Sequence, residues 1–163
     1  MWRRVALSAV CAAALGPAHA HAGDGAALFA QHCLMCHQSG AVGVAGQFPR
    51  LAGRVASIGR EPKGRSYLID VLTYGMTGSI VVDDQSIMGL MPPFAQVSND
   101  DAASILNYVQ ALDPPLSSVA SAAPHAPAAF SAEEFRVGRA RPPKTPADVL
   151  AERQSLAHAH VIP

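Results

Sequence analysis

Two cysteines and a histidine near the start of the chain form a pattern that can do chemistry. Cys33, Cys36 and His37 occur in the order C-x-x-C-H. Thiols at this spacing can bond covalently to the two vinyl groups of one haem. The histidine that follows is then held beside the iron, where its imidazole can serve as an axial ligand. The spacing therefore predicts the attachment of one haem c.

Two other kinds of site use closely spaced cysteines. A thioredoxin-like dithiol has its C-x-x-C pair beside a strand, within alternating strands and helices. Here Cys33 follows a predicted amphipathic helix, and that alternation is absent. A structural zinc site needs two more ligands at a suitable spacing, and neither His32 nor the histidines near the C-terminus offer a clustered second pair. Both remain alternatives to the haem.

An iron bound by one histidine has a sixth position, which a methionine can fill. A thioether opposite the histidine raises the reduction potential and suits electron transfer. The candidate is Met91, the first residue of a Met-Pro-Pro-Phe segment, because the two prolines stiffen the backbone that holds a weak donor. Met88 is a competitor, and Met76 and Met35 are weaker candidates. An isolated methionine is more often a core or surface residue.

The overall composition favours a globular chain without a strong electrostatic field. The 163 residues include 12 basic and 12 acidic residues, so the formal net charge is zero. Without a basic field we expect no nucleic-acid partner. Half of the residues (50%) are apolar, which is typical of a globular domain. The 13 glycines and 13 prolines predict long loops and short helices.

The first 22 residues have the features of a signal peptide. Two arginines precede an apolar run at residues 5–15, which is too short to span a bilayer comfortably. Small residues at the expected cleavage spacing follow at residues 18–22. We expect removal of residues 1–22, a periplasmic protein and no stable membrane span after cleavage; an uncleaved anchor is the alternative. Cys11 would leave with the signal peptide.

Three segments have helical patterns, and no segment has a convincing sheet pattern. Helices are expected at 24–32, where Asp24 can cap the start, at 65–74 and at 99–112. Residues 79–84 indicate at most a short extended segment. The sequence therefore predicts an all-α domain. Such a small domain has few apolar residues to bury, so a large apolar cofactor would help to complete its core.

The composition changes near the C-terminus. Residues 114–129 are rich in Ala, Pro and Ser, which is typical of a linker. Beyond it, Ser131 and Glu134 have the spacing of a capping box, and a short helix is expected at 146–156. Such helices are marginal alone. We interpret residues 114–163 as a linker and C-terminal extension, which is either disordered or able to dock a partner.

Five strings of the sequence carry a resemblance to a known family. In chain order they are AALFAQHCLMCHQ, FPRLAGR, YLIDVLTYGMTGSI, LMPPF and DDAASILNYVQAL. The segment 24–112 resembles the class I cytochrome c domain, and the C-x-x-C-H motif is the most specific of these features. The resemblance implies a cytochrome c domain over residues 23–113, with three main helices around a covalently bound haem. The first and last helices would cross where Phe29 and Tyr108 pack.

The resemblance also implies further residues at the haem site. In the family, a loop proline carbonyl accepts the second N–H of the axial histidine, and Pro49 is the matching position. Arg50 and Arg54 can pair with the haem propionates, because guanidinium groups suit carboxylates; the equally open alternative is that both face solvent. The implied haem-binding residues are Cys33, Cys36, His37, Pro49, Arg50, Arg54 and Met91, and the implied iron ligands are His37 and Met91.

One-electron transfer is the function that the resemblance implies. The segment TYGMTGSIVVDD at 73–84 resembles an insertion in cytochromes that serve periplasmic dehydrogenases, oxidases or reductases. We expect an electron carrier and not an enzyme, which links such an oxidoreductase to the respiratory chain as a free carrier or a bound cytochrome subunit. The alternative is a haem protein with an open or labile sixth site, which acts as a peroxidase-like enzyme or binds a gas ligand.

Overall fold

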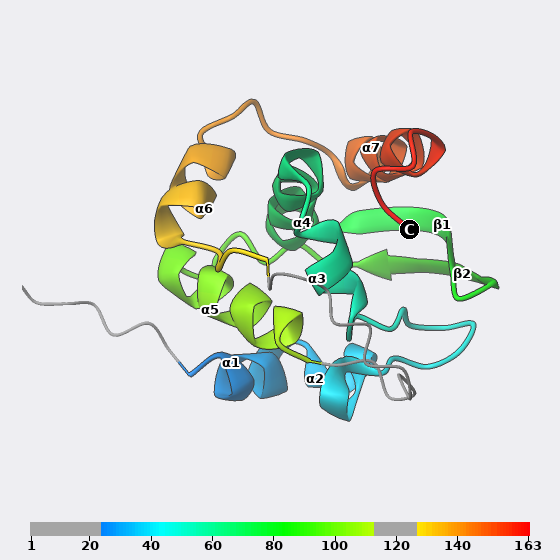
Figure 1. The fold of residues 1–163 in the computed structure, drawn as a ribbon, viewed down its shortest axis with the longest axis horizontal. Helices are drawn as coiled ribbons and strands as arrows, with labels where there is room; N and C mark the ends of the chain where they lie inside the picture. Colours follow the sequence, from blue (N-terminus) through cyan, green and yellow to red (C-terminus); the bar gives the residue numbers. More distant parts are fainter. Residues whose placement is uncertain (1–23, 113–126) are drawn as a thin grey trace, which may run out of the picture.

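The computed structural model describes residues 24–112 and 127–163 (Figure 1). The expected signal peptide with Cys11, and most of the expected linker, lie outside these residues. Within the described ranges, no helix is both long and apolar enough to cross a bilayer. In chain order the described elements are α1 (Gly25–His32), α2 (Leu34–His37), η1 (Ser39–Ala41), α3 (Arg54–Ile58), α4 (Pro62–Tyr74), β1 (Met76–Val82), β2 (Gln85–Met91), α5 (Asn99–Gln110), α6 (Ala132–Arg139) and α7 (Pro146–His158).

Helices α1 and α5 pack across each other beside the cysteine motif (Figure 1). The Asp24 carboxylate begins α1 by accepting a backbone hydrogen bond from its first turn (2.9 Å). Phe29 and Tyr108 pack at the crossing, with ring centroids 5.4 Å apart and planes inclined at 51°. Gly25 permits the close approach, because a β-carbon there would collide with the Ser104 carbonyl oxygen. These contacts confirm the predicted crossing and its two aromatic residues.

Helices α4 and α5 confirm the second and third predicted helices, with shifted ends. Helix α4 begins earlier than expected, at Pro62. A proline suits the first helical position, where its missing N–H would have no helical partner. Helix α5 begins after Ser98, whose hydroxyl accepts the backbone N–H of Asp101 (3.1 Å), and it ends at Gln110 rather than at residue 112.

The fold is mainly helical, as predicted, but it is not strictly all-α, because the chain between α4 and α5 forms an antiparallel β hairpin. Strands β1 and β2 pair over their full lengths, with Met76 opposite Met91. The turn residues Asp83 and Asp84 have φ values of 51° and 60°. Positive φ at both central residues is typical of the type I′ turn, whose twist suits a hairpin. Aspartate tolerates this conformation, but an aspartate pair is a weaker sequence signal than Asn-Gly.

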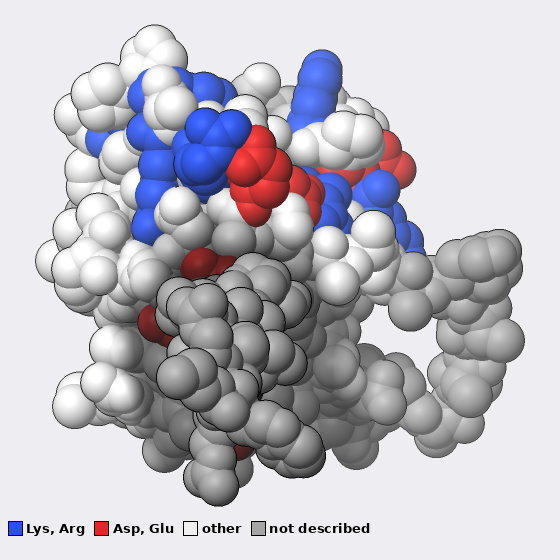
Figure 2. All heavy atoms as spheres, turned by 90° about the vertical axis from the view of Figure 1, so that its left-hand side faces the viewer, with Lys and Arg blue, Asp and Glu red and all other residues white. Residues whose placement is uncertain are grey.

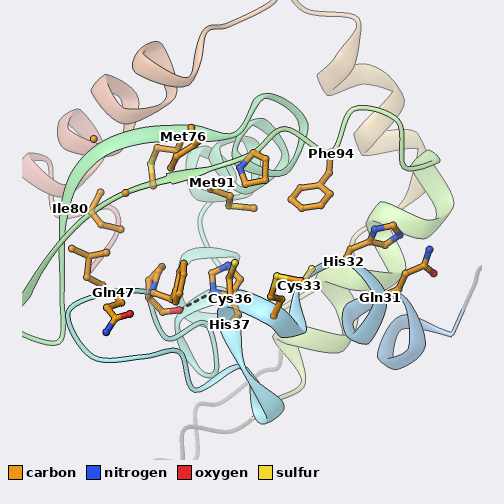
Figure 3. A pocket seen from close by; sticks show the side chains of 18 residues that line it. Gln31, His32, Cys33, Cys36, His37, Gln47, Met76, Ile80, Met91 and Phe94 are labelled. Carbon is orange, nitrogen blue, oxygen red and sulfur yellow. Dashed lines mark hydrogen bonds between the residues drawn. The ribbon is translucent and has the colours of Figure 1, made fainter.

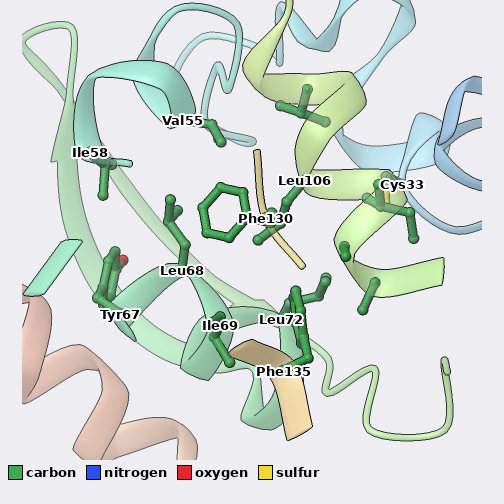
Figure 4. Packing of buried hydrophobic residues seen from close by; sticks show 14 of the residues in the cluster. Cys33, Val55, Ile58, Tyr67, Leu68, Ile69, Leu72, Leu106, Phe130 and Phe135 are labelled. Atoms are coloured by element: carbon green, nitrogen blue, oxygen red, sulfur yellow. The ribbon is translucent and has the colours of Figure 1, made fainter. Parts of the chain in front are cut away.

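The helices of the C-terminal extension pack against the domain instead of standing alone. Helix α6 lies against α4 and α5, and α7 lies against α4 and β1 (Figure 1). Phe130, just before α6, places its ring among Val55, Leu68 and Leu106 (Figure 4). Phe135 of α6 is fully buried in the same core. Tertiary packing therefore stabilises helices that would be marginal in isolation.

Polar contacts also join the extension to the domain. The side-chain amide of Asn107 in α5 exchanges two hydrogen bonds with the backbone of Phe130 (2.6 and 2.9 Å). Arg65 of α4 donates to both carboxylate oxygens of Glu134 in α6 (2.9 and 3.0 Å). Bidentate pairs of this kind fix geometry as well as supplying energy. The position of α6 is therefore set by both polar and apolar contacts.

A buried carboxylate anchors the segment between α6 and α7. Asp70 of α4 is 1% exposed, and its two oxygens lie 2.6 Å from Arg141 and 2.7 Å from Lys144. Lys144 also pairs with Glu152 of α7 (2.6 Å). A buried charge is tolerated only when it is paired, so these contacts fix α7 relative to α4.

Candidate haem site

The C-x-x-C-H motif lies where α1 ends and the one-turn helix α2 begins. The Cys33 backbone N–H donates to the Phe29 carbonyl (2.8 Å), and the His37 N–H donates to the Cys33 carbonyl (2.9 Å). Residues three and four apart are neighbours on a helix surface. Cys36 and His37 therefore lie beside Cys33, and all three residues line the same cavity.

This cavity has a volume of about 410 Å³ (Figure 3), which is within the range of cofactor sites. One wall is the segment after α1, and the opposite wall is the β hairpin with the Met-Pro-Pro-Phe segment. Among the described residues that line the cavity, none is Asp, Glu, Lys or Arg. Apart from the motif, the lining is largely apolar and includes Phe48, Ile80, Ile87, Leu90 and Phe94.

The backbone holds His37 in one orientation. Its Nδ1 lies 3.0 Å from the carbonyl oxygen of Pro49, so Nδ1–H donates there and the lone pair of Nε2 remains for a metal. His37 is 7% exposed. Burial lowers its pKa, against the raising effect of the hydrogen bond to Pro49. The imidazole is therefore held neutral, which is the form that binds a metal.

The surroundings of Cys33 differ from those of a redox-active thiol. Cys33 is 8% exposed, and burial raises the pKa of its thiol to about 11, with a further contribution from Cys36. Reactive dithiols instead have lowered thiol pKa values and partly exposed sulfur atoms. The structure therefore does not favour the dithiol alternative. In the described part of the chain, no group of three or more His, Cys, Asp or Glu side chains could hold a metal ion.

Two methionines lie on the wall opposite the motif. Met91 lines the cavity at the end of β2, and Figure 3 shows its side chain across from Cys36 and His37. Met76 is its register partner on β1 and also lines the cavity. Successive strand residues point to opposite faces. The Met88 side chain therefore lies on the hairpin face opposite to that of Met91, and it is 74% exposed.

Met76 was a weaker candidate in the sequence, yet it lines the cavity on the same wall as Met91. Met76, Gly78 and Ile80 alternate at the period of a strand and all line the cavity. This alternation is the signal that would have placed Met76 in the site, had the hairpin been recognised. The hydroxyl of Tyr67 donates a hydrogen bond to the Met76 sulfur (3.7 Å), so Met76 already has a polar partner.

Arg50 and Arg54 lie beside the hairpin turn, and neither lines the cavity. Arg50 donates from Nε and Nη2 to the two carboxylate oxygens of Asp83 (2.8 and 2.7 Å). Arg54 lies 3.7 Å from the same carboxylate and donates to the Pro163 backbone oxygen (3.0 Å). Both arginines therefore have protein partners, and their pairing with haem propionates stays a prediction.

A third arginine, which the sequence analysis did not single out, lies in the same region. Arg153 of α7 is 7% exposed, and its Nη2 donates to the carbonyl oxygens of Val81 (3.3 Å) and Pro163 (3.4 Å). Arg54 and Arg153 thus share Pro163 as an acceptor. No local pattern could have identified Arg153, because its position depends on α7 packing against β1.

The residues that line the cavity fit a covalently bound haem. Cys33 and Cys36 are both free thiols, as attachment to two vinyl groups requires. His37 presents an oriented imidazole, and a thioether lies on the opposite wall. The apolar lining between them matches the apolar faces of a porphyrin. Together the crossed helices and this donor set define a c-type cytochrome.

Comparison with known proteins agrees with this class. Residues 20–109 match the family described as cytochrome C oxidase, cbb3-type, subunit III. The chain is also 41% identical over 133 residues to a cytochrome c-552 of Thermus thermophilus, and the aligned region covers 82% of this chain and 96% of that relative. A second cytochrome c-552 of T. thermophilus has the same identity over the same length, with 85% of the relative covered. The chain belongs to the cytochrome c family, as a mono-haem class I cytochrome c.

Membership of this family establishes the cofactor and the general activity. The protein carries one covalent haem c and is an electron-transfer protein. The alignment with the relatives extends over 133 residues, which is longer than the predicted domain of residues 23–113. The similarity therefore continues beyond the haem domain.

Proposed function

We propose that this protein is a one-electron carrier outside the cytoplasmic membrane, in which His37 and Met91 fill both axial positions of the haem iron. The observation that carries the proposal is the arrangement of the two cavity walls. His37, oriented by Pro49 at 3.0 Å, lies on one wall, and Met91 lies across from it (Figure 3). An iron with both axial positions filled has no site for a substrate, which favours electron transfer over peroxidase-like catalysis or gas binding.

Each residue of the motif and its partners has a defined task in this proposal. Cys33 and Cys36 hold the cofactor covalently, so that it is not lost after export. The Pro49 carbonyl fixes the ring of His37 and increases its basicity as a ligand. The Met91 thioether raises the potential, and the apolar lining lowers the polarity around the iron. The bound haem supplies the one-electron redox chemistry.

The pairing of Arg50 and Arg54 with the haem propionates remains part of the proposal. Their side chains are only 24% and 12% exposed, so a carboxylate between them would be partly shielded from water. A propionate would have to share Arg50 with Asp83, which already accepts two hydrogen bonds from it. A guanidinium has five N–H donors, and Arg50 can therefore serve both acceptors.

Electron exchange requires a surface where the haem edge approaches its partner. Met35 and Leu90 line the cavity and are 87% and 66% exposed, so they form an apolar rim at its mouth. Charged side chains are visible on the upper part of the face that carries α5 and α6 (Figure 2); the exposed pair of Glu133 and Arg136 belongs to α6. We therefore propose a small, mainly apolar interface, which suits brief redox encounters and adaptable methionine contacts.

The proposal also includes a periplasmic location and redox partner proteins. The pattern of residues 1–22 supports the periplasm, and the resemblance of residues 73–84 supports an oxidoreductase and the respiratory chain as partners. The carrier is either free or a bound cytochrome subunit. If the described part of the extension docks a partner, it uses the solvent-exposed faces of α6 and α7, because Phe135 and Val149 are already fully buried.

The visible spectrum of the protein tests the ligation. We expect a low-spin oxidised spectrum with a methionine-to-iron charge-transfer band near the red edge, and no rapid binding of carbon monoxide to the reduced protein. A high-spin spectrum with rapid carbon monoxide binding would support the open-site alternative. A mass measurement on the same sample, which should show one added haem, ensures that the spectrum comes from fully loaded protein.

A further inference from the structure

Helix α7 touches the backbone of the cavity wall that carries the methionines. The helix lies next to β1, on the side of the hairpin away from α2 (Figure 1). A β-carbon at Gly78, whose φ is 125°, would lie only 2.5 Å from Cδ2 of Leu150. Gly78 also lines the haem cavity. A single backbone segment therefore separates the Leu150 side chain of α7 from the cavity.

A hydrogen bond fixes α7 to the same strand at a second point. Arg153 donates from Nη2 to the carbonyl oxygen of Val81, near the end of β1 (3.3 Å). Leu150 and Arg153 are three residues apart, so they are neighbours on one face of α7. This face contacts β1 at two positions, Gly78 and Val81.

The part of the hairpin that α7 contacts has little conformational stability of its own. Gly78 pairs with Gly89 across the hairpin, and both glycines line the cavity. Glycine within a strand weakens it, because it has no side chain to pack and loses more backbone entropy on folding. The next pair on the same face of the sheet is Met76 with Met91. The strand segment that carries Met91 is therefore next to the Gly78–Gly89 pair, where the hairpin depends on contacts with other elements for its stability.

Helix α7 is anchored well enough to give this support. Val149, next to Leu150, is fully buried, and Glu152 is joined through Lys144 to the buried Asp70 of α4. The helix is thus held by the core of the domain, independently of the hairpin. Movement of β1 away from the cavity would press Gly78 against the Leu150 side chain of this fixed helix.

We propose that α7 positions the methionine wall, with Leu150 and Arg153 holding β1 and, through the strand pairing, keeping Met91 at the iron. The proposal rests on the His37–Met91 ligation stated above. Leu150 and Arg153 are positioning residues, because they act through the hairpin and touch neither iron nor haem. Weakening this support lets Met91 leave the iron more often, so an external ligand competes more successfully for the sixth position.

Imidazole binding to the oxidised, haem-loaded full chain tests the proposal. Imidazole displaces the methionine, and the loss of the charge-transfer band reports the displacement. Leu150→Ala should raise the apparent affinity for imidazole about tenfold, which corresponds to about 1.4 kcal/mol. Leu150→Ile, which retains the volume, should behave as the wild type. Leu156→Ala is the matched control: it truncates a leucine of the same helix that is 7% exposed and points about 120° around the helix axis from Leu150.

Urea unfolding of the same variants separates positioning from general stability. Leu156→Ala should lower the free energy of unfolding at least as much as Leu150→Ala does, yet leave the imidazole affinity within about twofold of the wild type. The proposal is overturned if Leu150→Ala binds imidazole as the wild type does, or if both alanine variants gain affinity equally. A wild-type protein without the charge-transfer band would instead contradict the proposed ligation, and with it the basis of this inference.

Discussion

Arg50 donates two hydrogen bonds to Asp83 and thereby joins the two walls of the haem cavity. Arg50 follows Pro49, whose carbonyl orients His37. Asp83 forms the turn of the hairpin that ends at Met91. The ion pair therefore connects chain segments that lead to both proposed axial ligands.

Asp83→Asn should lower stability at neutral pH but not at acid pH. Hydrogen bonds from Arg50, together with its charge, hold the pKa of the Asp83 carboxyl below its usual value. A group with a depressed folded pKa contributes stability that is present above its unfolded pKa and is lost as the pH falls through the folded pKa. At pH 7 the loss should be below about 1 kcal/mol, because the pair is partly exposed. Urea unfolding at neutral pH and below the pKa of Asp83 measures it.

Asp84→Asn is the control for this substitution. Asp84 is the other turn residue, has a similar positive φ (60°), and within the described residues forms no ion pair. Its replacement should leave the free energy of unfolding nearly unchanged at both pH values. Equal losses in the two variants would mean that the turn conformation, and not the pair with Arg50, is responsible.

Replacement of the two cavity methionines should have different spectroscopic effects. Met91→Ala should abolish the charge-transfer band and let the reduced protein bind carbon monoxide, because the sixth position loses its ligand. Met76→Leu should retain the band, since Met76 is held by the hydroxyl of Tyr67. Absorption spectra of the oxidised variants make the comparison. A band that survives in Met91→Ala and disappears in Met76→Leu would reverse the assignment.

Asp70→Ala should destabilise the chain markedly, although Asp70 does not line the cavity. The substitution removes the buried acceptor of Arg141 and Lys144 (2.6 and 2.7 Å). Hydrogen bonds to charged groups contribute roughly 1.5–3 kcal/mol each, and the two released cations are partly exposed, so we expect a loss of about 2 kcal/mol.

Glu133→Ala provides the comparison, because it removes a carboxylate from an ion pair in which both side chains are 64% exposed. Urea unfolding should show little change for this variant. A loss for Asp70→Ala no larger than that for Glu133→Ala would contradict the anchoring role of the buried cluster.

Electron transfer to an oxidoreductase that co-purifies with this protein from its native host should depend little on salt. The rim residues Met35 and Leu90 are apolar, and the described cavity lining contains no Asp, Glu, Lys or Arg. Contacts without charge are not screened, so stopped-flow rates should change less than about twofold between about 0.01 M and 0.15 M ionic strength. A steep fall with salt would instead indicate docking through a charged face.

The haem motif and the starts of α1 and α5 could be predicted because their signals are local. The C-x-x-C-H spacing predicts the attachment of one haem, and the structure places its three side chains along one cavity. Asp24 caps α1 as predicted, and α5 begins at Asn99, the first residue of the predicted helix at 99–112. Phe29 and Tyr108 were placed by family resemblance, and the ring contact of 5.4 Å confirms them.

The hairpin and the packing of the extension could not be predicted, because both depend on contacts between distant segments. Gly78 and Gly89 weaken the strand pattern in the sequence, although they pair in the hairpin and both line the cavity. Phe130 lies in an Ala- and Pro-rich region and was counted with the extension, although it completes the core beside Leu68 (Figure 4). The pair between Arg50 and Asp83 could not be predicted either, because Asp83 comes within reach of Arg50 only when the hairpin forms.

A spectroelectrochemical titration of the haem-loaded full chain tests the central claim most directly. If His37 and Met91 remain ligands in both oxidation states, the chain should take up one electron in a single reversible wave, and the charge-transfer band should return completely on reoxidation. Uptake of more than one electron per chain, an irreversible wave, or a band that does not return would contradict a one-electron carrier with both axial positions filled by the protein.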